Sequence, residues 1–263
     1  MPVIQVVDSI TRLGLEFRGT VLVAGSHGGR YCGYLAALAG LRGVILNDAG
    51  VGKDKAGLGA LAYLQPLGVA AATVAHTSAR IGDGADMLKR GRLSYCNRVA
   101  RSLGCAVGQT CREAAEIMSQ GQAFAGEIPA YKESRTLLQQ TPVRIIACDS
   151  ASLVESGDAG AIIITGSHGG VLAGRPGYGI AAPVRGAVFN DAGVGIDQAG
   201  IQRLKVLERA AIPAVTVDVA SARIGDARSA WESGIISYIN AQAAKRGVTV
   251  GMTVPAFTEL LIL

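Results

Sequence analysis

Residues 21–29 read VLVAGSHGG and residues 162–170 read IIITGSHGG, so an apolar, β-rich run passes straight into the same glycine-rich motif at two places in the chain. Two further motifs recur in the same order: NDAGVG begins at residues 47 and 190, and SARIGD begins at residues 78 and 221. The second copies follow the first by 141 or 143 residues. An ordered series of matches at a nearly constant spacing indicates an internal duplication.

Each half contains four apolar runs that we interpret as strands. They occupy residues 3–7, 20–24, 43–46 and 70–75 in the first half and residues 143–148, 161–165, 186–189 and 214–219 in the second. Because these runs are apolar throughout, they indicate parallel sheets covered by helices on both faces. We predict a helix after each GSHGG motif, a second from about Asp54 or Asp197, and a longer third that follows SARIGD through Tyr95 or Tyr238.

The predicted fold is therefore α/β, with two tandem homologous βαβαβ-type halves whose mainly parallel sheets are related by a pseudo-two-fold axis. The first repeat covers residues 1–118 and the second covers residues 143–263. Residues 119–142 contain glycine, proline and charged residues, which are typical of a linker.

The composition excludes several classes of protein. Hydrophobic residues make up 49% of the chain and charged residues 17%, which is unlike a disordered chain. No run reaches the roughly 18 apolar residues of a membrane-spanning helix and the first residues lack the pattern of a signal peptide, so we expect a cytoplasmic protein with no membrane partner. The five cysteines form no CxxC pair, which argues against a disulfide framework or a zinc knuckle.

The net charge of +5 bears on the kind of partner. The basic residues are scattered and aromatic residues make up only 5% of the chain, so we expect no nucleic-acid partner. Because a basic protein attracts small anions, we expect a small-molecule substrate that is anionic. Homo-oligomerisation is expected because closed homo-oligomers are common among soluble proteins.

All three motifs directly follow predicted strands. In an open parallel sheet, the loops at the carboxyl ends of the strands form the ligand-binding edge, where helix N-termini present unpaired N–H groups. The two halves keep these loop residues while the intervening helices differ, so the loops carry the constraint. We therefore expect the site in a cleft formed by strand-end loops of both halves.

The GSHGG motifs supply the first candidate catalytic residues, Ser26 and His27 with the matched Ser167 and His168. Histidine is the usual acid or base near neutral pH. Adjacent residues at a strand end point to opposite sides, so we expect each side chain to find its partner in another loop. The glycines allow a ligand to approach the backbone closely. The candidate substrate-binding glycines are Gly28, Gly29, Gly169 and Gly170. The alternative is a tight turn in which histidine only packs.

The NDAGVG motifs add Asp48 and Asp191 as catalytic candidates, which could orient or deprotonate an imidazole. The neighbouring Asn47 and Asn190 are candidate substrate-binding residues, because an amide can donate to an oxyanion. The glycines and the acidic residue that follows equally suit a strand-to-helix turn with an N-cap carboxylate, so part of the motif is expected to be architectural.

The SARIGD motifs contribute Arg80 and Arg223, whose guanidinium groups suit bidentate recognition of a carboxylate or phosphate. If the carboxyl edges of the halves face each other, we expect both to converge on one cleft. The alternative is that each arginine pairs with its own Asp83 or Asp226. Just upstream of the SARIGD motifs the two halves carry different residues, so we expect a site composed from both halves to be asymmetric.

These residues favour an enzyme that acts on a small polar or anionic metabolite. Hydrolysis of a C–N or ester-like bond is the leading expectation, from the serine, histidine, aspartate and asparagine side chains. The first alternative is an isomerase or racemase, because two matched acid/base groups facing one carbon suit proton transfer. The second is a non-catalytic small-ligand-binding protein. The sequence leaves the cofactor open: His27, Asp48, His76 and Asp83 could together form a metal site of oxygen and nitrogen ligands, although their spacing does not demand one.

Overall fold

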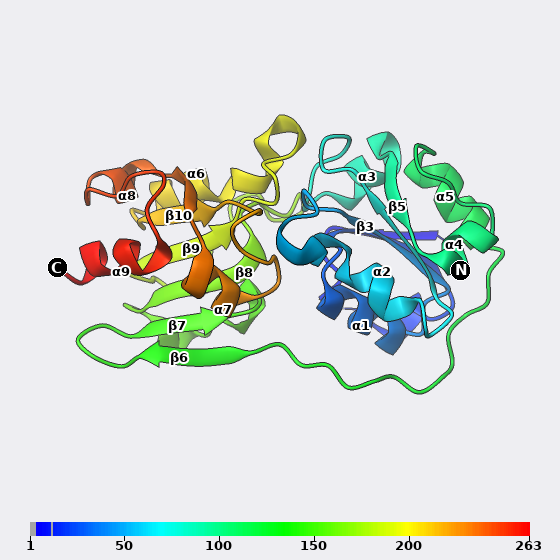
Figure 1. Ribbon diagram of the computed structural model, residues 1–263, viewed down its shortest axis with the longest axis horizontal. Helices are drawn as coiled ribbons and strands as arrows, with labels where there is room; N and C mark the ends of the chain where they lie inside the picture. The colour runs from blue at the N-terminus through cyan, green and yellow to red at the C-terminus, as the bar shows by residue number, and fades with distance from the viewer. Residues whose placement is uncertain (1–3, 12) are drawn as a thin grey trace.

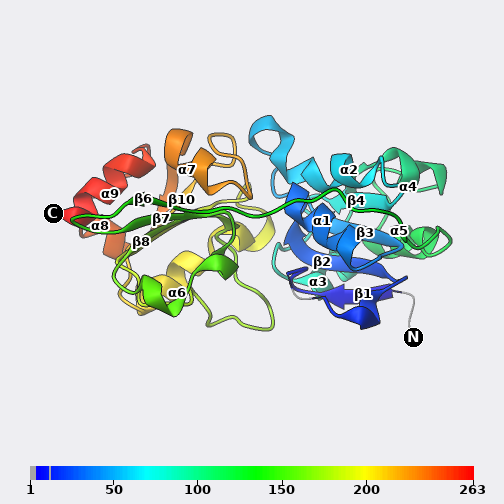
Figure 2. The same cartoon turned by 90° about the horizontal axis from the view of Figure 1, so that it is seen from below.

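The computed structural model describes residues 4–11 and 13–263, which form two α/β lobes side by side (Figure 1). The first lobe ends after helix α5 (Cys111–Met118) and the second begins at strand β6 (Arg135–Gln139). The C-terminus lies at the outer end of the second lobe, and one extended segment, residues 121–134, crosses from the first lobe to the second (Figure 2). We call this segment the strap.

Each lobe has its own mainly parallel sheet. The first sheet has the order β1-β2-β3-β4-β5 and only its last strand is antiparallel to its neighbour. Its strands are β1 (Ile4–Val7), β2 (Val21–His27), β3 (Gly43–Asn47), β4 (Ala70–Val74) and β5 (Leu93–Cys96). The second sheet has the order β11-β10-β9-β8-β7-β6, with antiparallel strands at both edges. Its strands are β6 (Arg135–Gln139), β7 (Ile145–Cys148), β8 (Ile162–His168), β9 (Gly186–Asn190), β10 (Ala214–Val217) and β11 (Ile236–Ile239).

Helices interleave with the strands. The first lobe contains α1 (Arg30–Leu38), α2 (Gly59–Leu64), α3 (Gly84–Arg90), α4 (Arg98–Ser102) and α5 (Cys111–Met118). The second contains α6 (Arg203–Arg209), α7 (Ala227–Ser233), α8 (Ala241–Ala244) and α9 (Val254–Ile262). None of the helices in the described ranges combines the length and apolar character that a membrane span requires.

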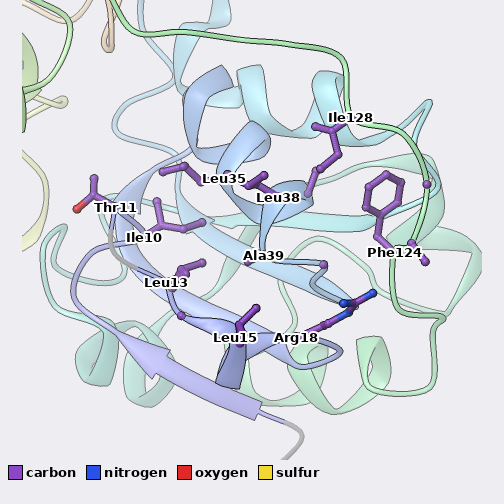
Figure 3. Close-up of a pocket in the computed structure, with 15 residues that line it drawn as sticks. Ile10, Thr11, Leu13, Leu15, Arg18, Leu35, Leu38, Ala39, Phe124 and Ile128 are labelled. Carbon is purple, nitrogen blue, oxygen red and sulfur yellow. The ribbon is translucent and has the colours of Figure 1, made fainter.

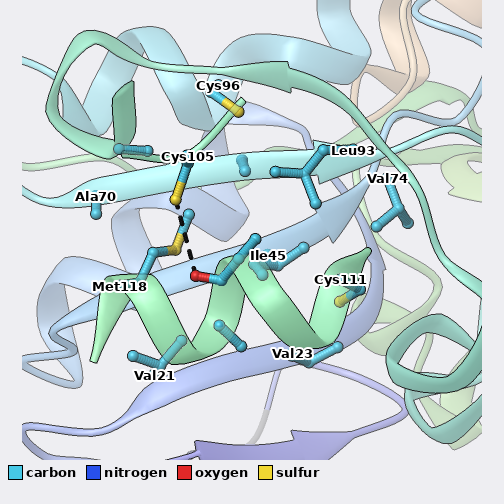
Figure 4. Close-up of a cluster of buried hydrophobic side chains, with 14 of the residues drawn as sticks. Val21, Val23, Ile45, Ala70, Val74, Leu93, Cys96, Cys105, Cys111 and Met118 are labelled. Atoms are coloured by element: carbon cyan, nitrogen blue, oxygen red, sulfur yellow. Dashed lines mark hydrogen bonds between the residues drawn. The ribbon is translucent and has the colours of Figure 1, made fainter. Parts of the chain in front are cut away.

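The central strands are apolar throughout because both of their faces are buried. Val21, Val23 and Ile45 pack beneath α5 on one face of the first sheet (Figure 4). Leu22 and Val44, which alternate with them, pack beneath α1 and α2 on the other face. The predicted α/β class with mainly parallel sheets is therefore confirmed, whereas the pseudo-two-fold relation between homologous halves stays a prediction.

The predicted helix after GSHGG exists only in the first lobe, as α1. In the second lobe, residues 169–185 form bends, turns and one isolated bridge between Leu172 and Arg175, so the prediction was wrong there. Pro176 and Pro183 lack the backbone N–H that a helix needs, and three further glycines, at 174, 177 and 179, disfavour it.

Two other helix predictions were also wrong in their bounds. Asp54 and Asp197 adopt positive φ of 54° and 57° inside short 3₁₀ segments, and α2 and α6 begin several residues later. Tyr95 and Tyr238 lie on the antiparallel edge strands β5 and β11 because α3 and α7 end at the preceding glycines.

The predicted linker also contains regular structure. Its residues 135–139 form β6, which pairs with β7 and becomes an edge of the second sheet. The strap is thus shorter than the predicted linker, and it is joined directly to the second sheet.

Candidate functional site

The two lobes meet through the loops that follow their central parallel strands. The backbone N–H of Lys53 donates to the carbonyl oxygen of Val219 over 2.8 Å. At the matched positions, the N–H of Ile196 donates to the carbonyl oxygen of His76 over 2.9 Å. The carboxyl ends of the central strands of the two sheets therefore face each other, and the loops of all three motifs share one interface.

Glycine is required where the two NDAGVG loops touch. A Cβ atom added to Gly50 would lie 2.9 Å from the Cα atom of Gly193, and one added to Gly193 would meet Gly50 at the same distance. Val51 and Val194 both have φ of 63°, a conformation that costs roughly 1–2 kcal/mol. Strain of this kind is typical of functional loops.

A cavity of about 670 Å³ lies between the lobes at this interface. It is lined by the GSHGG side chains of both lobes, Ser26, His27, Ser167 and His168. Arginines, tyrosines and one glutamate complete much of its polar lining: Arg30, Arg175, Arg203, Arg223, Tyr31, Tyr131, Tyr178 and Glu133. A volume of this size suits a small metabolite, and the lining residues come from both lobes and from the strap.

The two cavity histidines share one arrangement. Their ring centroids lie 6.5 Å apart and their planes meet at 78°. Nδ1 of His27 accepts from the N–H of Gly29 over 3.0 Å, and Nδ1 of His168 accepts from the N–H of Gly170 over 3.2 Å. An accepting Nδ1 assigns the proton of a neutral imidazole to Nε2, which is then a hydrogen-bond donor.

Both imidazoles are neutral at physiological pH. Burial lowers the pKa of His27 to about 4. Burial also lowers the pKa of His168 well below its usual value, and the positive charge of Arg203 lowers it further. Neutral imidazoles of low pKa are weak bases, and they serve better as uncharged donors to a developing negative charge.

The four GSHGG glycines predicted to bind substrate shape the turn and do not line the cavity. A Cβ atom on Gly29 would lie 2.6 Å from Nδ1 of His27, and one on Gly170 would lie 2.9 Å from Nδ1 of His168. The N–H groups of Gly28 and Gly169 donate to the carbonyl oxygens of the two motif asparagines. These four glycines allow the histidine rings and the next strand to pack closely.

Ser26 and Ser167 each hold the segment that follows the first parallel strand of the lobe. The hydroxyl oxygen of Ser26 accepts from the N–H of Ile10 over 3.0 Å, and that of Ser167 accepts from the N–H of Ala151 over 2.9 Å. Within the described part of the chain, neither serine is hydrogen-bonded to a histidine. Both serines still line the cavity.

Each motif asparagine bonds to its own turn and to the SARIGD loop of the same lobe. The side-chain amide of Asn47 donates to the carbonyl oxygen of Ala79, and its Oδ1 accepts from the N–H of Ala49. Asn190 makes the matched pair of bonds in the second lobe. Both side chains are buried outside the cavity lining, so their amide groups are not directed at a ligand.

Asp48 orients an imidazole, as predicted. The imidazole is that of His76 at the lobe interface and not that of a cavity histidine. Oδ1 of Asp48 lies 2.9 Å from Nδ1 of His76. Burial alone would raise the pKa of Asp48, yet the hydrogen bonds from His76 outweigh it and lower that pKa. Asp191 instead accepts from the N–H groups of Gly193 and Val219, and burial raises its pKa. Neither aspartate lines the cavity.

Arg223 lines the cavity and Arg80 does not, so the expected convergence of the two arginines was wrong. Arg223 pairs with Asp226 of its own loop and, across the interface, with Asp54. Arg80 pairs most closely with Asp86, at 3.2 Å.

The irregular loop that replaces a helix in the second lobe explains this difference. Ala173 in that loop donates its N–H to the carbonyl oxygen of Gly82, over 2.9 Å, and so packs against the loop that carries Arg80. The site is therefore asymmetric.

Arg203 was not predicted from the sequence. The residue is 5% exposed, and its Cζ lies 4.9 Å from the ring centre of Phe189. It has no carboxylate within ion-pairing distance in the described ranges. The matched residue of the first half is Ala60, so comparing the two halves gave no signal for it.

Glu133 was also not predicted, because it lies in the strap and has no counterpart. Burial raises its pKa to about 7, and the negative charge of Asp149 adds to the effect. A carboxyl group with this pKa is half ionised near neutral pH and can exchange a proton there.

The strap is fixed on both sides of Glu133. The guanidinium group of Arg30 lies 5.2 Å from the ring centre of Tyr131, and the hydroxyl of Tyr63 donates to the carbonyl oxygen of Pro129 over 2.6 Å. On the other side, the N–H of Ser134 donates to Asp149 over 2.7 Å. These contacts hold Tyr131 and Glu133 at the cavity.

A second hollow, of about 520 Å³, lies on the first lobe away from the interface (Figure 3). It is lined mainly by apolar side chains, among them Leu13, Leu38 and Phe124. None of the site residues predicted from the sequence lines it. The cavity between the lobes is therefore the candidate site.

Two further results bear on this site. In the described ranges, no three histidine, cysteine, aspartate or glutamate side chains come together in a group that could hold a metal ion. Comparison of the chain with protein-family models, with curated proteins and with solved structures found no match.

Proposed function

We propose that the protein is an enzyme that transfers a proton on a small anionic metabolite bound between the lobes. One observation carries the proposal: a single cavity contains a glutamate with a pKa raised to about 7 together with two neutral histidines. An ionisable carboxyl group that shares a cavity with uncharged imidazole donors is one combination that supports proton abstraction next to a carbonyl group.

Glu133 is the acid and base in this proposal. Its carboxylate takes a proton from the carbon next to a substrate carbonyl, and the electron pair of that C–H bond moves to the carbonyl oxygen. The resulting oxyanion accepts hydrogen bonds from the Nε2–H groups of His27 and His168. Return of the proton from Glu133 to a neighbouring position, or to the opposite face, completes an isomerisation or racemisation.

Hydrolysis of a C–N or ester-like bond is the second candidate. Glu133 would then take its proton from a water molecule, and the same imidazoles would stabilise the tetrahedral oxyanion. The lining of the cavity by the hydroxyls of Ser26 and Ser167 favours this alternative, because either could donate to the leaving group.

Proton exchange in heavy water tests the proposal. A panel of small carboxylates and phosphate esters with a carbonyl group is incubated with the protein in D₂O, and loss of the C–H signal next to the carbonyl is followed by proton NMR. We expect exchange for at least one compound, and a loss of roughly 100-fold or more in Glu133→Gln. Glu127→Gln, which alters an exposed strap glutamate outside the cavity, is the matched control. Hydrolysis products without C–H exchange would replace the first candidate by the second.

A further inference from the structure

We infer that the cavity binds a compact dianion, and that one of its anionic groups completes the hydrogen bonding of Arg203. This inference rests on the proposed function, since it names the substrate class for the same cavity. The geometry at Arg203 carries it.

Arg203 is a buried cation with donors to spare. Its Nε and Nη2 donate to the carbonyl oxygen of Gly170 over 3.1 and 2.8 Å, and Nη1 donates to that of Gly179 over 3.2 Å. A guanidinium group has five N–H donors, so two remain without an acceptor in the described part of the chain. Burial lowers the pKa of Arg203 to about 10, and the group is therefore still charged at neutral pH.

A buried charge without a counter-charge is costly unless a ligand supplies one. Arg203 lies at the first turn of α6, and its carbonyl acceptors belong to the loop that replaces a helix in the second lobe. The first lobe has Ala60 at the matched position. The cavity therefore contains one deep anion site and not two.

The charges that line the cavity indicate a second anionic group. Four arginines line it, and one of them, Arg223, is paired with both Asp54 and Asp226 at 2.9 and 3.0 Å. Four guanidinium groups and two aspartates give a charge of +2, and an ionised Glu133 lowers it to +1, so the lining stays positive and attracts a second anionic group. Arg30 and Arg175 are exposed, line the same cavity and have no carboxylate partner among the described residues, so we assign the outer anionic group to them.

The chemistry shared by possible ligands is a carboxylate or phosphate at Arg203 and a second negative group within the cavity. Both anions match the planar fork of a guanidinium group. A dicarboxylate and a carboxylated phosphate ester are the two sources, and the choice of probes separates them.

Thermal unfolding with defined anions tests the inference. Malonate, inorganic phosphate and acetate are added at equal ionic strength to the full chain, and the dissociation constant is obtained from the rise in Tm. We expect saturable stabilisation by malonate or phosphate and none by acetate. Tighter binding of malonate would indicate dicarboxylates, and tighter binding of phosphate would indicate phosphate esters.

Arg203→Lys should weaken binding of the stabilising dianion at least tenfold, because lysine lacks the fork. Arg42→Lys is the matched control, since Arg42 also donates only to backbone carbonyl oxygens but lies outside the cavity. Arg175→Gln, at an exposed position, provides a second variant that should weaken binding if Arg203→Lys does not fold. Equal affinity in Arg203→Lys, or stabilisation by no dianion, would overturn the inference.

Glu133→Gln separates this inference from the proposed function. It should keep dianion binding and lose C–H exchange. Dianion binding without exchange in the parent protein would leave the inference standing and reject the proton-transfer proposal. C–H exchange on a monoanionic compound, with no binding of any dianion, would support the proton-transfer proposal and reject the dianion inference.

Discussion

The imidazole rings of His27 and His168 lie 6.5 Å apart, centroid to centroid, although 141 residues separate them in the chain. Each ring follows the matched strand of its own lobe, and each accepts a backbone N–H at Nδ1. The two rings meet because the carboxyl ends of the strands in one sheet face those in the other sheet. The pair consequently presents two neutral donors to one cavity.

Replacing either cavity histidine should reduce turnover. We expect His27→Phe and His168→Phe, which keep a ring but remove its N–H donor, each to lower kcat roughly 100-fold or more, the usual loss for one oxyanion donor, with little change in the far-ultraviolet circular dichroism spectrum. His76→Phe is the control, because this third histidine lies outside the cavity lining. Equal losses for all three variants would show that the effect comes from structure and not from the cavity.

The pH dependence of the rate should follow Glu133. If its carboxylate is the base, kcat/KM rises as the pH passes through about 7, because the ionised fraction increases. Glu133→Gln should remove both the activity and this pH dependence. The profile is measured between pH 5 and 9 with the best compound from the exchange panel. A flat profile in the parent protein would reject Glu133 as the base.

The depressed pKa of His27 should make the protein less stable in acid. The unfolded state binds this proton below the usual pKa of 6.5, whereas the folded state resists it until about 4, so stability falls as the pH drops through that window. Glu133 has the opposite effect, because its pKa is raised on folding. The comparison is therefore made in Glu133→Gln, with and without His27→Gln.

Urea unfolding at pH 7 and pH 4.5 measures this difference. We expect the free energy of unfolding to fall by about 2 kcal/mol more when His27 is present than when it is replaced. The same fall in both proteins would show that His27 takes up its proton equally well in the folded state.

The contact between the NDAGVG loops should be intolerant of any side chain. Gly50→Ala and Gly68→Ala both introduce a Cβ atom at similar positive φ, 75° and 73°. Only Gly50 faces another backbone, that of Gly193, while nothing lies within 4 Å of the Cβ position at Gly68. We expect a loss of about 1 kcal/mol at Gly68 and a loss at least 2 kcal/mol greater at Gly50, measured by urea unfolding. Equal losses of unfolding free energy in the two variants would show that the lobes can move apart at Gly50 and Gly193 without losing stability.

The two SARIGD arginines should differ in what they affect. Arg80→Lys weakens the ion pair with the buried carboxylate of Asp86, so we expect a lower Tm with an unchanged KM. Arg223→Lys alters the cavity lining, and we expect a raised KM. Both quantities are measured for both variants. A raised KM for Arg80→Lys would mean that this arginine also reaches the substrate.

The repeated motifs predicted the fold class and the edge of the sheet at which the candidate site lies, because strands followed by glycine-rich loops are a local pattern. His27 and His168 could be chosen for the same reason, as they end matched strands. The roles expected for Asn47 and Asp48 could not be judged locally. Their partners, Ala79 and His76, lie about 30 residues further on in another loop.

The sequence by itself thus determined two α/β lobes with paired histidines at the ends of their strands. Only the tertiary structure decided which charges share the cavity. Arg203 is buried by a loop that two prolines keep from forming a helix, and Glu133 is held at the cavity by contacts between the strap and both lobes. Burial and the distances between charges set the pKa of each group, and both depend on residues remote in the chain.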